Sequence, residues 1–120
     1  MAGTLLQPDN QLSKKRRYQK TLAFLNESIN PPAHILDIGT PNALSEEMRQ
    51  KGYKITSTNG EDLDETTDYI HTVYADCTTA FEIFEHLLNP LGVLKAIRSE
   101  KLVASIPLSL WFAKAYRNKN

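Results

Sequence analysis

The sequence predicts an α/β fold: a mostly parallel sheet with helices on both of its faces. Short apolar runs alternate along the chain with segments of helical spacing, as in successive βα units. Gly39, Gly60 and Pro107 mark the ends of three of these runs. The 120 residues are 41% apolar and 23% charged, which suits one soluble globular domain with a modest core.

The first twelve residues carry no hydrophobic period, so we expect residues 1–12 to form a flexible tail and residues 13–120 to form the single domain. A helix is predicted to begin at Ser13, a favourable N-cap residue, and to end at the Asn30-Pro31-Pro32 run. Its inner face carries Tyr18, Leu22, Leu25 and Ile29.

The next segment predicts a strand, a tight turn and a helix. The strand extends from Ala33 to Ile38, and the helix ends at Gly52, a residue suited to a left-handed C-terminal cap. Leu44 and Met48 share one face of this helix. A second strand is predicted over residues 53–58, and Asn59-Gly60 marks the turn that ends it.

Residues 61–74 are the least regular part of the sequence. Tyr69 to Tyr74 is an untidy strand candidate, and residues 75–80 form a better one. The apolar residues that follow have helical spacing: Phe81, Phe84, Leu87 and Leu88.

Asn89-Pro90 supplies an N-cap and a first-turn proline for a further helix, whose inner face is expected to carry Leu91, Leu94 and Ile97. Residues 101–106 form the last predicted strand, which Pro107 ends. A final helix can begin within residues 108–116.

Three segments resemble class I S-adenosylmethionine-dependent methyltransferases. Asp37-Ile38-Gly39-Thr40-Pro41-Asn42-Ala43 resembles their first motif, Asp-x-Gly-x-Gly-x-Gly, with the first glycine in place. Residues 79–87 with Asn89-Pro90 are similar to the fourth strand and following helix of the ubiquinone-biosynthesis O-methyltransferase group. Residues 102–107 are similar to that group's fifth strand, which ends in Ser-x-Pro. The resemblance covers about residues 33–107.

The resemblance implies a Rossmann-like fold and S-adenosylmethionine as the cofactor. It implies that the cofactor is contacted by Asp37, Gly39, Thr40, Asn59 and Phe81. Asn59 stands where the family usually has an acidic residue for the ribose hydroxyls, and an amide binds a diol without the added strength of a carboxylate.

The sequence departs from the family pattern in three places. Pro41 and Ala43 replace glycines of the cofactor loop, which removes one N–H donor and adds a methyl group. The interval between Asn59 and Ala75 is short for the helix and third strand that the family places there. The chain ends soon after the fifth strand of the family, so we expect the C-terminal strands of that fold to be missing and the chain to be a fragment.

The function implied by the resemblance is methyl transfer from S-adenosylmethionine to an unidentified small-molecule acceptor. The cofactor brings the electrophile, so no strong catalytic residue is expected. The alternative is a non-catalytic remnant of the fold that binds a ligand or a partner. A dinucleotide-binding oxidoreductase is less favoured, because Asn59 and the Glu85-His86 segment fit that family less well.

Four other candidates have a plainer interpretation. Glu85-His86 lacks partners at metal-ligand spacing and predicts a structural or solvent-facing role. Glu82 and Glu85, one helical turn apart, form a solvated pair. Residues 14–17 form a solvated basic helix face, and Cys77 is a small core residue rather than a nucleophile.

Charge and hydropathy narrow the possible partners and locations. Lys plus Arg and Asp plus Glu both number 14, which favours neither nucleic acid nor a membrane as a partner. The N-terminus lacks the apolar core of a secretory signal, so we expect a cytoplasmic protein. An open sheet edge near residues 101–116 would favour self-association.

Overall fold

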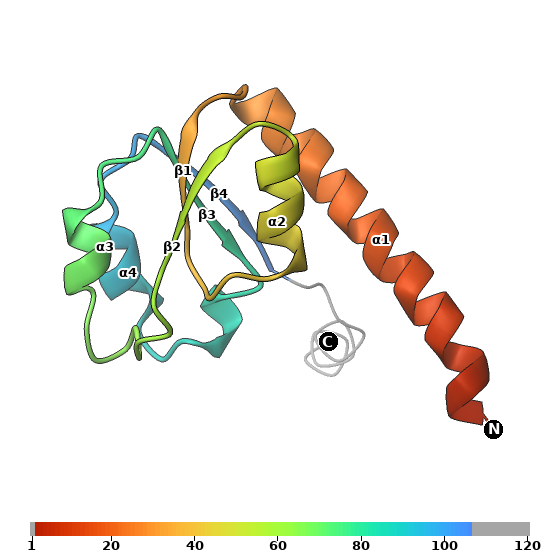
Figure 1. The fold of residues 1–120 in the computed structure, drawn as a ribbon. Coiled ribbons are helices and arrows are strands. Elements are labelled where there is room, and N and C mark those ends of the chain that lie inside the picture. Colours follow the sequence, from red (N-terminus) through yellow and green to blue (C-terminus); the bar gives the residue numbers. More distant parts are fainter. Residues whose placement is uncertain (1, 107–120) are drawn as a thin grey trace, which may run out of the picture.

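The chain folds around a sheet of four parallel strands (Figure 1). The computed structural model describes the backbone of residues 2–106 and the side chains from residue 12 onward. The strands are β1 (His34–Asp37), β2 (Lys54–Ser57), β3 (Cys77–Phe81) and β4 (Lys101–Ser105). They lie in the order β2-β1-β3-β4, and every neighbouring pair is parallel. The predicted Rossmann-like α/β fold is confirmed.

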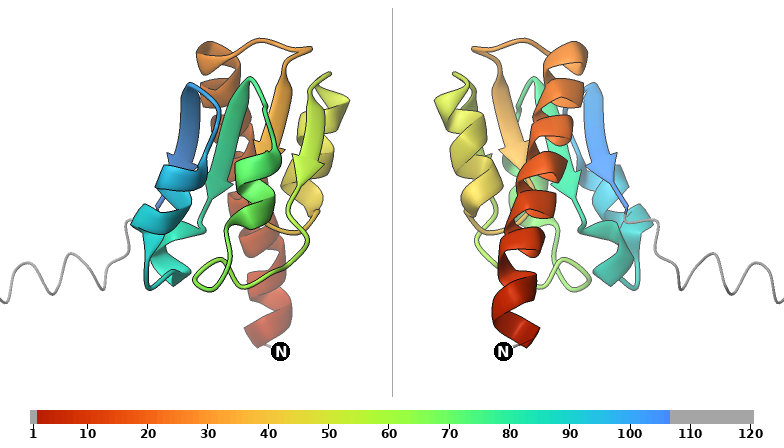
Figure 2. Two further views of the ribbon diagram at one scale, coloured as in Figure 1. Left: turned by 90° about the vertical axis from the view of Figure 1, so that its left-hand side faces the viewer. Right: turned by 90° about the vertical axis from the view of Figure 1, so that its right-hand side faces the viewer.

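Helices cover both faces of this sheet, as the two views of Figure 2 show. Helices α1 (Ala2–Ser28) and α2 (Ala43–Gln50) lie on one face. Helices α3 (Asp68–Thr72) and α4 (Pro90–Ala96) lie on the other, and a short 3₁₀ helix, η1 (Phe84–His86), follows β3.

Each face of the sheet has its own core. Side chains of β1 alternate between the two faces, so Ile35 packs toward α1 and α2, whereas Leu36 packs toward α3 and α4. The first core contains Leu25, Ile35, Met48, Tyr53, Cys77 and Val103. The second contains Leu36, Ile38, Ile70, Ala80, Val93 and Ala96. Cys77 is therefore a core residue, as predicted.

Helix α2 ends near Gly52, as predicted, and begins at a cap that was not predicted. The side chain of Asn42 accepts a hydrogen bond from the N–H of Ser45, and Ser45 Oγ accepts one from the N–H of Asn42, so the two residues form a capping box. At the other end Gly52 has a φ of +104°, which suits the cap expected there. Leu44 and Met48 face the core, as predicted.

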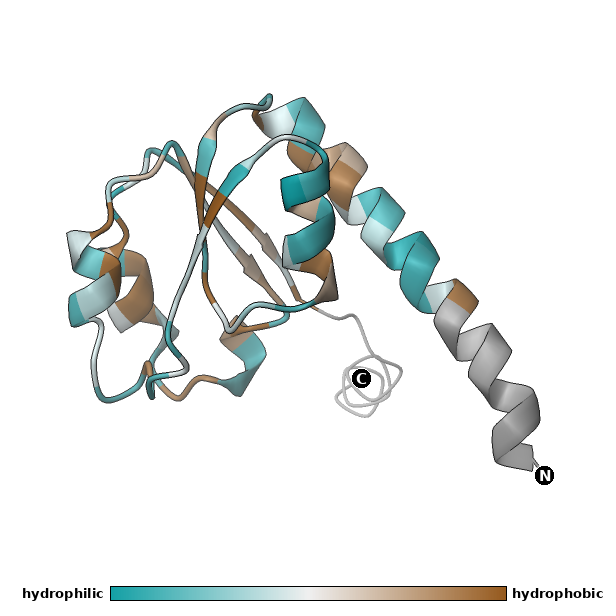
Figure 3. Ribbon diagram, in the orientation of Figure 1, coloured by the Kyte–Doolittle hydropathy of each residue, from teal (hydrophilic) through white to brown (hydrophobic). Residues whose placement is uncertain are grey.

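The N-terminal segment differs from the prediction of a tail over residues 1–12. Helix α1 begins at Ala2 rather than at Ser13 and extends past one end of the sheet (Figure 1). Residues 12–17 are exposed, and Figure 3 colours much of this part of the helix hydrophilic. An exposed stretch of helix needs no periodic apolar residues, so apolar spacing does not show where such a helix begins.

Two predictions between residues 69 and 88 are wrong. The strand candidate at residues 69–74 is occupied by α3, whose Ile70 is completely buried. The helix expected from Phe81 onward is replaced by the end of β3 and the single turn of η1. Glu82, with a φ of +58°, breaks the helical path between them, so Glu82 and Glu85 do not share a helix face.

The inner face of α4 is also different from the predicted one. Val93 and Ala96 are buried, and Ile97 packs at the margin of the core, whereas Leu91 is 62% exposed and Leu94 39%. Because α4 carries apolar residues on more than one side, the spacing of apolar residues does not determine which side is buried. The Asn89 cap is confirmed, since its side chain accepts a hydrogen bond from the N–H of Gly92.

Strand β4 is an outer strand of the sheet within the part of the chain that the structure describes. Leu102 and Ile106 expose 38% and 60% of their surface beside this edge. Most of the segment expected to mediate self-association, and the helix predicted at residues 108–116, lie outside the described residues, so both stay predictions. Within residues 2–106, no helix combines the length and hydropathy needed to cross a membrane.

Candidate functional site

The strand order places a topological switch point at the carboxyl ends of β1 and β3. From β1 the chain passes through α2 to β2 on one side, and from β2 it returns past β1 to β3 on the other. The connections that leave β1 and β3 run in opposite directions. Neither of them covers the space between the carboxyl ends of these two strands. Open α/β sheets bind ligands in this kind of crevice.

The loop after β1 is held by hydrogen bonds to the segment after β2 and to the start of α2. Gly39 has a φ of +131°, and its N–H donates to Thr58 Oγ1 at 2.8 Å. The N–H of Asn42 and that of Ser45 are used within the α2 capping box. The φ of +131° explains why a glycine occupies position 39, because residues with a Cβ rarely adopt such a φ.

Asp37 is a buried carboxyl group at the end of β1. It is 4% exposed, and Thr79 Oγ1 on the neighbouring β3 donates a hydrogen bond to its Oδ1 at 2.7 Å. Burial raises the pKa of Asp37 from 3.8 to about 6, although the Thr79 hydrogen bond and the positive charge of Arg49 oppose this rise. A carboxyl group with a shifted pKa in a crevice is typical of a functional site.

A first cavity of about 190 Å³ opens at the switch point, and four of the five predicted cofactor residues line it: Asp37, Gly39, Thr40 and Phe81. Its remaining walls come from Tyr18, Ile38, Asn42, Leu44, Glu82 and Ile83. The structure thus brings the loop after β1 together with the end of β3.

Asn59, the fifth predicted residue, does not line this cavity. It is exposed after β2, and its N–H donates to Glu61 Oε1 at 2.9 Å. The loop that carries it nevertheless approaches the first cavity, because a Cβ on Gly60 would lie 3.3 Å from Thr40 Cγ2. Asn59 therefore lies near the edge of the first cavity rather than inside it.

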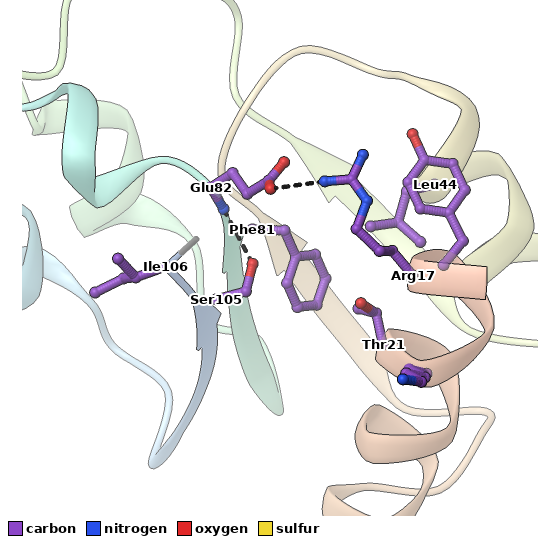
Figure 4. Close-up of a pocket in the computed structure, with 9 residues that line it drawn as sticks. Arg17, Thr21, Leu44, Phe81, Glu82, Ser105 and Ile106 are labelled. Atoms are coloured by element: carbon purple, nitrogen blue, oxygen red, sulfur yellow. Dashed lines mark hydrogen bonds and ion pairs between the residues drawn. The ribbon is translucent and has the colours of Figure 1, made fainter. Parts of the chain in front are cut away.

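A second cavity of about 270 Å³ adjoins the first (Figure 4). The two share four lining residues: Tyr18, Leu44, Phe81 and Glu82. The second cavity is completed by Arg17, Lys20, Thr21, Ser105 and Ile106, which come from α1 and the end of β4. The two adjoining cavities lie at the carboxyl ends of β1, β3 and β4 and are together called the groove.

Glu82 occupies the junction of the two cavities, and sequence reasoning missed it. Its N–H donates to the carbonyl oxygen of Ser105 at 3.0 Å and also contacts Ser105 Oγ at 3.2 Å. Its carboxylate pairs with Arg17 at 3.1 Å, and Figure 4 shows this ion pair and the contact with Ser105 Oγ. Both side chains are about half exposed, so this ion pair adds little stability. A non-glycine residue with a positive φ is uncommon, and it is often found at functional sites.

Residues 14–17 are exposed, as predicted, and Arg17 also pairs with Glu82 across the groove. Tyr18 was predicted to face the core and instead lines both cavities. Both the Arg17–Glu82 ion pair and the position of Tyr18 result from the way α1 passes the strand ends. No local pattern in the sequence predicts this packing. Glu82 and Tyr18 are therefore identified by tertiary structure alone.

The other sequence candidates lie away from the groove. Glu85 and His86 are exposed in η1, and no cluster of metal-binding side chains occurs among the described residues. Cys77 is fully buried in the first core, where burial raises the pKa of its thiol. A raised thiol pKa disfavours the nucleophilic thiolate.

Comparison of the chain with protein-family models, with curated proteins and with solved structures gave no significant match.

Proposed function

We propose that this domain binds S-adenosylmethionine in the first cavity and transfers its methyl group to a small-molecule acceptor. The observation that carries the proposal is the meeting of three segments at one end of the sheet. The groove is bordered by three segments: the loop of Asp37 and Gly39, the end of β3 at Phe81 and the end of β4 at Ser105. These are the same segments that resemble the methyltransferase family.

The residues of the first cavity suit a ligand with a cationic amino-acid portion. The Asp37 carboxylate can accept a hydrogen bond from an ammonium group, and Thr79 fixes the orientation of that carboxylate. Ile83 and Phe81 provide apolar walls. When bound, S-adenosylmethionine would supply the electrophilic methyl group, and the residues of the groove would align the acceptor and exclude water.

One observation favours the alternative, a non-catalytic remnant that binds a ligand or a partner. The N–H groups of Gly39, Asn42 and Ser45 are already engaged within the protein, and Pro41 has none. The loop consequently offers few main-chain donors to a ligand. A first cavity of about 190 Å³ is also small compared with ligand sites, which usually occupy about 300–1,000 Å³.

Calorimetric titration with S-adenosylmethionine, S-adenosylhomocysteine and NAD tests the proposal. We expect the first two to bind and NAD not to bind. Because the pKa of Asp37 is about 6, its charged form increases between pH 5 and pH 7.5, and the affinity for S-adenosylhomocysteine should rise over this range. The Asp37→Asn variant should lose this pH dependence.

The non-catalytic alternative would be favoured if S-adenosylhomocysteine binds but no labelled methyl group is transferred from S-adenosylmethionine to any component of a small-molecule cell extract. Absence of binding to either sulfur ligand would contradict the proposal, and binding of NAD alone would support the oxidoreductase interpretation.

A cytoplasmic location of the protein stays a prediction.

Asn59→Asp is expected to tighten S-adenosylhomocysteine binding, because the side chain at position 59 is proposed to contact the ribose. A carboxylate makes a stronger hydrogen bond to a hydroxyl group than an amide does, so we expect a gain of about threefold to tenfold. Glu61→Gln is the matched control, since Glu61 already contacts the main chain of Asn59. No gain in Asn59→Asp together with a loss in Glu61→Gln would assign the ribose contact to Glu61.

A further inference from the structure

We propose that the second cavity is the acceptor site and that it takes a molecule with an apolar body and one anionic group. This inference rests on the proposed function for the role of the acceptor, whereas the selectivity for an anion follows from the cavity itself. The cavity borders the first cavity along Tyr18, Leu44, Phe81 and Glu82. A molecule bound there would lie directly beside the ligand of the first cavity.

The floor of the second cavity is apolar. Phe81 at the end of β3 and Leu44 at the start of α2 meet there, and Ile106 after β4 closes the far side (Figure 4). Leu44 is only 6% exposed and Phe81 packs against the first core, so this floor is fixed by the fold. Apolar walls of this kind favour a ligand whose body is hydrophobic.

The charged residues of the cavity favour an anion. Arg17 and Lys20 both extend from α1, and Glu82 is the one acidic residue among the lining side chains. The carboxylate of Glu82 is already paired with Arg17 at 3.1 Å. No ion pair of Lys20 is present among the described residues, so its ammonium group is available to a ligand. The hydroxyl groups of Thr21 and Ser105 can add hydrogen bonds.

A pair of fluorescent probes tests this selectivity. 1-Anilinonaphthalene-8-sulfonate has an aromatic body and a sulfonate, and N-phenyl-1-naphthylamine has the same body without the charge. We expect the anionic probe to bind more tightly, and its affinity to fall as the salt concentration rises. Lys20→Gln should weaken the anionic probe by up to about fivefold, the range of an exposed ion pair, and should leave the neutral probe unchanged.

Matched variants locate the probe. Lys15→Gln removes an exposed charge from the same helix without touching the cavity and should have no effect. Leu91→Ser removes a hydrophobic residue that is exposed on α4 and should have no effect either. Circular dichroism of each variant checks that the helices are retained.

The probe should remain bound when S-adenosylhomocysteine is saturating, because the two cavities are adjacent. Equal affinity in wild type and Lys20→Gln, or equal affinity for the two probes, would overturn the anion selectivity. Competitive displacement by S-adenosylhomocysteine would overturn the acceptor role, because both molecules would then occupy one site. A protein that binds no S-adenosylhomocysteine would refute the proposed function, whatever the probes show.

Discussion

The Asp37→Asn variant is expected to be more stable than the wild type at pH 7.5, by on the order of 2 kcal/mol. The native fold holds this carboxyl group at 4% exposure and raises its pKa to about 6, chiefly because burial penalises the charged form. An asparagine avoids that penalty, and its amide oxygen can still accept the hydrogen bond from Thr79. Urea unfolding, with the midpoint compared at constant slope, measures the difference.

The same residue makes the stability of the wild type depend on pH. Between about pH 4 and pH 6 the folded protein holds a proton at Asp37 that the unfolded chain has released, so the contribution of Asp37 to stability is largest below pH 4 and is lost as the pH rises through 6. Asp37→Asn should lack this decrease, whereas Glu100→Gln, at an exposed position, should keep it. A less stable Asp37→Asn protein at pH 7.5 would contradict this prediction and would show that the carboxylate stabilises the fold.

Gly39→Val is expected to destabilise the fold by on the order of 3 kcal/mol and to abolish binding in the first cavity. The cause is the backbone rather than crowding. An added Cβ would meet Ile83 Cδ1 at 3.6 Å, an ordinary contact distance, but a β-branched residue rarely adopts a φ of +131°. The variant therefore affects the fold itself as well as the binding of a ligand. Thermal and urea unfolding measure the loss.

Thr40→Ala is the control for Gly39→Val, because Thr40 is exposed in the same loop and the change should alter stability by less than about 0.5 kcal/mol. If the two variants unfold at the same urea concentration, the loop tolerates a side chain at Gly39 by moving. The strained conformation would then not be a requirement of the fold.

Several elements of the fold could be predicted from the sequence because their signals are local. The run at Ile35 and Leu36 predicts a buried strand, and Gly52 marks the end of the helix that follows it. Parallel pairing of the strands follows from the alternation of strands and helices.

The candidate site was predictable in part for the same reason. Asp37 and Gly39 lie in one continuous motif at the end of a strand, and strand order brings Phe81 beside them. Asn59 is one strand further out and stands at the rim, because the position of a side chain after a strand depends on the turn that follows it. In this protein Glu61 binds the main chain of that turn.

The sequence by itself determined the C-terminal end of α2, the cap of α4 and the loop that carries Asp37 and Gly39, since each depends on residues within a few positions of one another. Tertiary structure decided which side of α4 is buried, where α1 crosses the sheet and how Glu82 meets Arg17. Each of these depends on surfaces that are distant in sequence and fit together in space. Packing selects Val93 over Leu91, and the crossing of α1 over the strand ends creates the second cavity.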